Sequence, residues 1–255
     1  MNKPWILIAA LGLALPAHAL DWNEMLKGAM EKATSAPAPS TAPVTVSGVD
    51  SLSSTDINSG LKEALSRGAD AAVAQLGVKD GFFGNAALKI PLPKSLQKAE
   101  KIMRMVGMGK QTDELVLSMN RAAEAAVPEA KTLLVGAVKE MTLEDAKGIL
   151  TGGKTSATDF FRKKTEATLT ERFGPIVKAT TDKVGLAQQY NRYAGMAAQY
   201  KMLDKNQSNV EQYVTQQALD RLYTVIGEKE AALRANPLQA GSDLLKKVFG
   251  AVMGK

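Results

Sequence analysis

The stretch MTLEDAKGILTGGKTSATDFF, residues 141–161, decides between two folds for this 255-residue chain. Its residues 148–155 match the phosphate-binding pattern G-x-x-x-x-G-K-[ST] at every defined position. Such a loop requires a buried strand before the glycines, because backbone N–H groups at the start of the following helix bind the phosphates. Residues 141–147 are instead patterned as a helix, with Thr142 as its N-terminal cap and Asp145 three residues later. The stretch therefore favours helix, glycine hinge, helix over a nucleotide-binding α/β fold.

The hinge itself has two expected features and one functional alternative. Gly152 and Gly153 should end the first helix in the left-handed conformation that glycine adopts without strain. Ser156, with Asp159 three residues later, should form a second capping box at the start of the next helix. The alternative, phosphate or nucleotide binding, would use three residues of the hinge: Gly153, Lys154 and Thr155.

Residues 1–19 have the pattern of a secretory signal peptide. Lys3 gives a positive start, residues 5–15 form an apolar run too short to span a bilayer stably, and Ala17-His18-Ala19 is a small-x-small cleavage site. We expect cleavage after Ala19 and a periplasmic or secreted protein.

The residue types that remain after such cleavage exclude several kinds of catalytic site. The chain has no cysteine, and its one histidine, His18, belongs to the predicted signal peptide. Ser-His-Asp and Cys-His nucleophiles and the usual zinc and copper sites are therefore excluded, whereas carboxylate or lysine chemistry and oxygen-ligated calcium or magnesium stay open. We expect no cofactor, and a non-enzyme more than an enzyme. The formal charge of +6 is too small to indicate nucleic-acid binding, and is compatible with weak attraction to anionic lipid head groups.

Two segments separate the signal peptide from the main domain. Residues 20–33 form an amphipathic pattern whose apolar face includes Trp22, Met25, Leu26 and Met30. This short helix could dock on the main domain, bind a membrane or a partner, or stay disordered. Residues 34–51 are rich in Pro, Ala, Ser and Thr, which is typical of a flexible linker.

Residues 52–255 are patterned as one helical domain of about eight helices. The first helix should end at Gly77, and residues 89–93 should form a rigid apolar tie against the helices, with an exposed docking segment as the less favoured use. A further helix, from about residue 93 to residue 106, should stop at Gly107 and Gly109. The longest apolar stripe, residues 115–141, should open at Thr112 and be interrupted at Pro128, and its alanines place it at the centre of the bundle.

The domain carries several further expectations. Gly174-Pro175 should restart a helix, and a capping box at Ser208 and Glu211 should open another, which Asn236-Pro237 ends before a final amphipathic helix. The segment that ends at Tyr200 holds two further tyrosines, Tyr190 and Tyr193, whose spacing puts them on one face that should line the core edge or a cavity. A polar group beside the long stripe favours a structural ion pair over a functional site: Asn120, Arg121 and Glu124.

Four segments carry a resemblance to a known family: GLKEAL (60–65), MNRAAEAAVP (119–128), ATDFF (157–161) and LLKKVFG (244–250). The chain resembles, over nearly all of residues 52–250, a family of exported bacterial helical domains catalogued as a conserved domain of unknown function. The resemblance implies an envelope location and an all-helical fold, and it supplies no catalytic residue. It also implies that the hinge more often carries an acidic residue at the position of Lys154, which weakens the nucleotide alternative.

These observations predict an all-α protein with a non-catalytic role. We expect a periplasmic binding or interaction protein that holds an apolar small molecule between alanine-lined helices or meets a partner protein of the envelope. The alternatives are phosphate or nucleotide binding at the hinge, and peripheral membrane attachment through the N-terminal helix.

Overall fold

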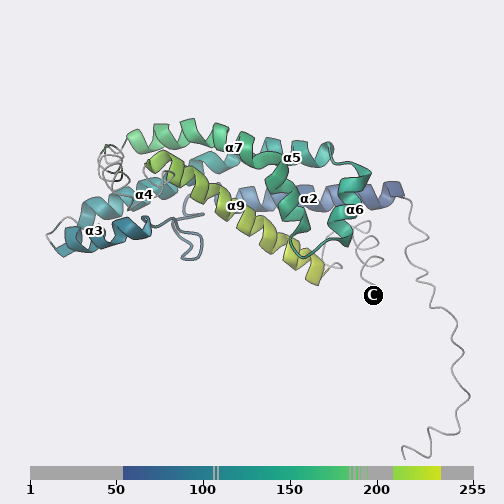
Figure 1. Cartoon of the computed structure of the whole chain (residues 1–255), viewed down its shortest axis with the longest axis horizontal. Helices are drawn as coiled ribbons and strands as arrows, with labels where there is room; N and C mark the ends of the chain where they lie inside the picture. Colours follow the sequence, from purple (N-terminus) through teal and green to yellow (C-terminus); the bar gives the residue numbers. More distant parts are fainter. Residues whose placement is uncertain are drawn as a thin grey trace, which may run out of the picture. The chain divides into compact units, whose positions relative to one another are not determined.

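A computed structural model describes residues 54–105, 107, 109–183, 185, 188, 190, 194 and 209–236. All regular structure in these residues is helical, which confirms the all-α class (Figure 1). The predicted signal peptide, the helix at 20–33, the linker at 34–51 and the final helix after Pro237 lie outside the described residues.

The described residues hold seven α-helices and one short 3-10 helix, where the sequence predicts about eight helices over the whole domain. Their bounds are α2 Ser54–Leu76, α3 Lys94–Met105, α4 Gly109–Ala126, η1 Val127–Glu129, α5 Ala130–Lys139, α6 Leu143–Thr151, α7 Ser156–Asp182 and α9 Val210–Ala235. The predicted ends at Gly77, Gly107 and Asn236 and the interruption at Pro128 are confirmed.

The 141–161 stretch folds as helix, hinge, helix, and no strand precedes the glycines. Thr142 caps α6 by accepting from the N–H of Asp145, whose side chain accepts from the N–H of Thr142, so the predicted capping box is confirmed. The predicted left-handed stop is wrong, because Gly152 has φ −77° and ψ −178°. Glycine is required there by close approach: a Cβ atom on Gly152 would lie 2.5 Å from the carbonyl oxygen of Gly148.

Helix α7 begins at Ser156 as predicted, but two predicted caps and one predicted helix start are wrong. The capping box at Ser156 does not form; Thr155 precedes α7, and its hydroxyl donates to Asp159. Asn209, rather than Ser208, caps α9 by accepting from the N–H of Gln212. The helix expected to open at Thr112 begins three residues earlier, at Gly109. Thr112 is a buried residue within α4.

The predicted break at Gly174-Pro175 is also wrong, because α7 continues through Pro175 to Asp182. A proline inside a helix costs about 3 kcal/mol in lost hydrogen bonding and steric clash. Phe173 and Val177, on either side of it, are both fully buried. Burying two such side chains contributes roughly 3–6 kcal/mol, which is enough to hold the helix together across the proline.

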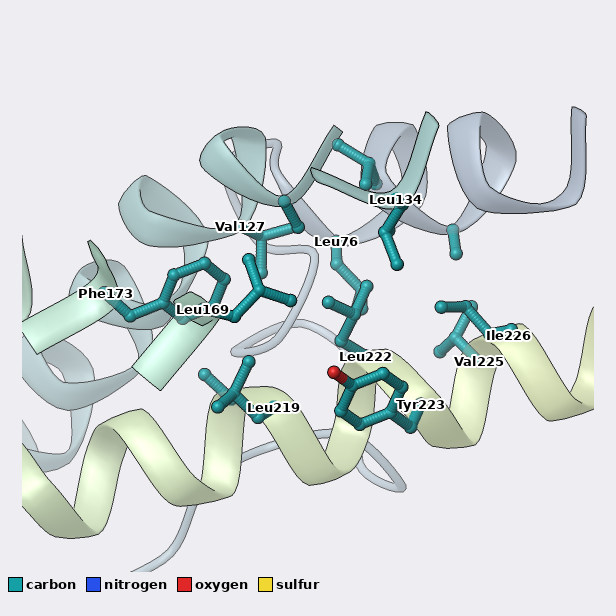
Figure 2. Packing of buried hydrophobic residues seen from close by; sticks show 14 of the residues in the cluster. Leu76, Val127, Leu134, Leu169, Phe173, Leu219, Leu222, Tyr223, Val225 and Ile226 are labelled. Atoms are coloured by element: carbon teal, nitrogen blue, oxygen red, sulfur yellow. The ribbon is translucent and has the colours of Figure 1, made fainter. Parts of the chain in front are cut away.

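The core lies between α7 and α9, with α2, α4 and α5 packed against them. Figure 2 shows Leu169 and Phe173 of α7 pointing into the same interior as Leu219 and Leu222 of α9. The predicted alanine stripe of α4 is buried, with Ala122, Ala123 and Ala126 all at 0 % exposure. Small side chains at this position allow α4 to approach α7 closely.

Candidate functional site

The 77–93 connection between α2 and α3 has no helix, yet it is fixed by a buried carboxylate. Oε1 of Glu124, on α4, accepts hydrogen bonds from the backbone N–H groups of Phe82 and Phe83, both at 3.1 Å. Glu124 is only 5 % exposed, and its other oxygen accepts from Arg121 at 2.5 Å. Arg121 also bonds Asp80 at 2.7 Å, so the ion pair extends across the turn that begins the connection.

Asn120 holds the far end of the same connection. Its side-chain oxygen accepts from the N–H of Ile90 at 2.8 Å, and its side-chain nitrogen donates to the Ile90 carbonyl at 2.9 Å. The amide thus binds Ile90 as a neighbouring strand would, although no strand is present in this part of the structure. Ile90 is fully buried and Leu92 nearly so, which confirms the predicted apolar tie at residues 89–93.

Helix α9 binds this connection from another side. The hydroxyl of Tyr213 donates to the carbonyl of Pro91 at 2.9 Å, and Arg221 donates to the carbonyl of Lys89 at 3.2 Å. Burial raises the pKa of Tyr213 and lowers that of Arg221. The connection is therefore bonded to α4 and to α9 and does not behave as a free loop.

A second buried carboxylate lies at the phosphate-loop motif. Glu230 of α9, 7 % exposed, accepts from the N–H of Ala157 at 3.0 Å with one oxygen and from the N–H of Thr158 at 2.9 Å with the other. The Thr158 hydroxyl donates to it as well, at 2.8 Å. These are N–H groups at the start of α7, where a helix favours a negative charge. The carboxylate therefore occupies the anion-binding position at the N-terminus of α7.

Arg234, one turn after Glu230, bonds the other side of the hinge. It pairs with Glu230 at 2.8 Å and donates to the carbonyl of Ile149, in the last turn of α6, at 2.9 Å. It also donates to the hydroxyl of Ser156 at 2.7 Å. A cation at the C-terminal end of α6 and an anion at the N-terminal start of α7 both match the helix dipoles.

The three residues predicted for phosphate binding lie in the hinge. Gly153, Lys154 and Thr155 are exposed, and the structure brings Lys154 into no ion pair within the described residues. The hydroxyl of Thr155 donates to Asp159 at 3.0 Å. The residues predicted for membrane or partner contact lie outside the described residues: Trp22, Met25, Leu26 and Met30.

The described residues include one small apolar cavity and two larger clefts. An apolar cavity between α2, α6, α7 and α9 measures about 30 Å³, room for about one water molecule. Two open clefts on the surface are larger. One, of about 310 Å³, lies between α7 and α9. The other, of about 230 Å³, lies between α3, α4 and the 77–93 connection, and we call it the α3 cleft.

The α3 cleft combines an apolar floor with charged walls. Phe83, Pro91, Leu92 and Val116 provide the apolar lining. The ammonium group of Lys89 lies 4.1 Å from the centroid of the Phe83 ring. Three further charged side chains line it: Glu100, Arg104 and Asp113.

Two carboxylates have lowered pKa values. Hydrogen bonds from Arg104 lower the pKa of Asp113, and bonds from Thr142 lower the pKa of Asp145. Both carboxylates are thereby kept charged, whereas a general acid at neutral pH needs a raised pKa. In residues 54–236 as described, no group of three or more potential ligands is placed to hold a metal ion.

Membrane spans can be assessed for the same residues. None of the helices described is both long enough and apolar enough to cross a bilayer.

Only part of this arrangement of side chains was predicted from the sequence. Asn120, Arg121 and Glu124 stand at helical spacing, and the predicted structural ion pair is confirmed for Arg121 and Glu124. Nothing local indicates that Asn120 and Glu124 bind a segment some 30 to 42 residues earlier in the chain. Glu230 and Arg234 were missed altogether, because an i, i+4 pair of opposite charges is usual on any exposed helix face.

The comparisons with known proteins give a family. A family model described as "Protein of unknown function (DUF4197)" matches residues 51–250 of the 255. The chain belongs to DUF4197. No curated protein and no solved structure matched it.

Two segments that suggested this membership serve the DUF4197 fold. Residues 119–128 contain Asn120 and Glu124, which bind the 77–93 connection. Residues 157–161 begin with Ala157 and Thr158, whose backbone N–H groups donate hydrogen bonds to Glu230. Both segments therefore take part in hydrogen bonds between parts of the chain that lie far apart in sequence.

Proposed function

We propose that this DUF4197 protein is a non-catalytic interaction protein of the bacterial envelope, which meets its partner on its surface. One observation carries the proposal: the only charged side chains buried in the described residues, Glu124 and Glu230, both accept backbone N–H groups of other segments. Their hydrogen-bonding capacity is used in holding the fold. A buried carboxylate that is fully bonded in this way is not available to a substrate.

The cavities favour a surface contact over an enclosed apolar ligand. Ligand pockets usually measure about 300–1,000 Å³, whereas the apolar cavity described above measures about 30 Å³. The α3 cleft is open, has an apolar floor and carries charges of both signs. Such a lining suits a segment of a partner protein better than a lipid tail. An envelope location rests on the signal-peptide pattern of residues 1–19.

Nucleotide binding at the hinge receives no support from this geometry, because no strand precedes the glycines and Glu230 already takes the N–H groups of Ala157 and Thr158 at the start of α7. Attachment of the N-terminal helix to a membrane, through Trp22, Met25, Leu26 and Met30, stays a prediction.

The non-catalytic role is tested by assaying the processed chain, residues 20–255, against ester, phosphate-ester, peptide and glycoside substrates. We expect turnover no faster than in buffer. Turnover that a single carboxylate substitution abolishes would contradict the proposal.

The surface contact is tested in living cells with a photo-crosslinking residue at position 89, in the α3 cleft, and with the same residue at position 154 as a control. We expect a discrete protein adduct from position 89 alone. Equal crosslinking from both positions, or none from position 89, removes the α3 cleft as the contact surface.

A further inference from the structure

Helix α3 presents one row of lysines that ends in an exposed methionine. Lys94, Lys101 and Met105 follow one another at intervals of seven and four residues, so they lie on a single helical face. Lys94 and Lys101 are exposed, and Met105 is 78 % exposed, the highest value of any large apolar side chain described. We call this row the lysine face of α3.

The other faces of α3 are occupied by the protein itself. Leu96 packs against the core. Arg104 pairs with Glu100 on its own helix and with Asp113 on α4, so the single acidic side chain of α3 is already bonded away from the lysine face. Lys94 and Lys101 form no ion pair within the described residues.

The sequence that follows Met105 carries no acidic residue before Lys110, since residues 104–110 read RMVGMGK. Gly107 takes φ +83°, a conformation that side-chain-bearing residues avoid, so glycine permits the tight reversal into α4. Over residues 94–110 the chain carries five basic residues and one acidic residue.

Two other exposed apolar side chains show that this combination is particular to α3. Leu143, 51 % exposed, is followed directly by Glu144 and Asp145. Val78, 54 % exposed, is followed by Lys79 and Asp80, one charge of each sign. Of these positions, only Met105 stands within an excess of positive charge.

We infer that the lysine face of α3, with Met105 at its end, forms a contact for an anionic lipid surface. Lysines on one flat face attract anionic head groups, and the methionine at the end enters the interface between head groups and acyl chains. A protein partner would need a pocket shaped for Met105, whereas a bilayer surface accepts an apolar side chain without one. The contact rests on the proposed envelope location and is distinct from the N-terminal helix.

The test is flotation of the processed chain, residues 20–255, with vesicles of phosphatidylcholine containing phosphatidylglycerol and with vesicles of phosphatidylcholine alone. We expect binding to the anionic vesicles at low salt and its loss at high salt. Each of the variants Lys94→Gln and Lys101→Gln should bind about fivefold more weakly. Met105→Asp should also weaken binding. Because all three side chains are exposed, circular dichroism should show unchanged helix content.

Matched controls carry the same changes elsewhere: Leu143→Asp and Lys154→Gln, both at exposed positions. We expect them to float as the parent does. Equal binding to both kinds of vesicle, equal losses in the controls, or no loss in the α3 variants overturns the inference. So does a loss that only Trp22→Asp produces, because it assigns the contact to the N-terminal segment. None of these outcomes bears on the turnover or crosslinking experiments, which test the proposed function separately.

Discussion

Two glutamate–arginine pairs hold this fold together, and they differ in how they use the carboxylate. Glu124 pairs with Arg121 at i, i+3 and holds the 77–93 connection, while Glu230 pairs with Arg234 at i, i+4 and holds the α6–α7 hinge. In each pair, the carboxylate accepts two successive backbone N–H groups from a distant segment. The arginine in each case reaches a further group on that segment.

The two carboxylates differ in how many of their oxygens accept backbone N–H groups. Both N–H groups of the 77–93 connection bond to one oxygen of Glu124, and the other oxygen faces Arg121. At Glu230 the N–H groups of Ala157 and Thr158 bond to different oxygens, so both oxygens are needed. Glu230 also lies at a helix start, where the dipole of α7 adds to its attraction. The hinge pair should therefore contribute more to stability than the connection pair.

Removal of the Glu230 carboxylate should lower the free energy of unfolding more than any other change proposed here. Glu230→Ala leaves two buried N–H groups without an acceptor, and leaves Arg234, 17 % exposed, without its partner. Loss of one member of a buried ion pair typically costs about 3–5 kcal/mol, and we expect the free energy of unfolding in urea to fall by about that amount.

The control for this change is Glu228→Ala, two residues earlier on an exposed position of the same helix. Its effect should stay within about 0.5 kcal/mol, as is usual for surface substitutions. A Glu230→Ala variant as stable as the Glu228→Ala variant would mean that the hinge is held by packing alone.

Replacement by glutamine separates the two pairs directly. Glu124→Gln retains the one oxygen that accepts both N–H groups, so we expect a loss of about 1 kcal/mol, the typical value of one hydrogen bond. Glu230→Gln must turn an NH₂ group toward one of its donors, which leaves a buried N–H unsatisfied, and we expect a loss of about 2–3 kcal/mol. Equal losses in chemical denaturation would remove the distinction between the pairs.

These pairs also mark the limit of prediction from the sequence. The helices, the ends at Gly77 and Gly107 and the cap at Thr142 were predictable, because each depends on residues within one or two helical turns. Glu230 and Ala157 are 73 residues apart, and their hydrogen bond depends on how α7 packs against α9. A single sequence contains no local signal for such a contact.

The errors at Ser156 and Pro175 have the same origin. A capping box was expected at Ser156 from its spacing to Asp159, but Glu230 supplies the acceptor from another helix, so the local cap is not required. The break at Pro175 was expected from the local cost of proline, which the burial of Phe173 and Val177 outweighs. In both places a tertiary contact replaces a local rule.

The cap of α6 offers a smaller and purely local contrast to the two buried pairs. Hydrogen bonds from Thr142 lower the pKa of Asp145 below its ordinary value of 3.8. A group with a depressed pKa in the folded state contributes stability above its unfolded pKa, and that stability is lost as the pH falls through the folded pKa. Asp145→Asn should cost about 1 kcal/mol at neutral pH, in line with other lost caps.

The pH dependence tests the cause of this loss. Unfolding in urea should show a difference between the parent and Asp145→Asn that is constant above about pH 5 and decreases below pH 3.8. A difference that persists unchanged into acid would show that the charge of Asp145 is not the origin. Thr142→Ala provides the matched change on the other side of the same hydrogen bonds.

Substitution of Lys154 should change the free energy of unfolding least. It also tests whether the Glu230–Arg234 pair keeps a phosphate out of the hinge. The first three N–H groups of α7 are all taken: that of Ser156 donates to the carbonyl of Gly153, and those of Ala157 and Thr158 donate to Glu230. Lys154 is exposed and contributes nothing to this arrangement, so Lys154→Ala should change the free energy of unfolding by less than about 0.5 kcal/mol. A phosphate at the N-terminus of α7 would have to displace a buried, charge-paired carboxylate. Calorimetry with Mg-ATP should therefore give no binding heat for the parent or for Lys154→Ala. Binding by the parent that Lys154→Ala removes would show that Glu230 yields its position, and would restore the phosphate-loop function that the geometry disfavours.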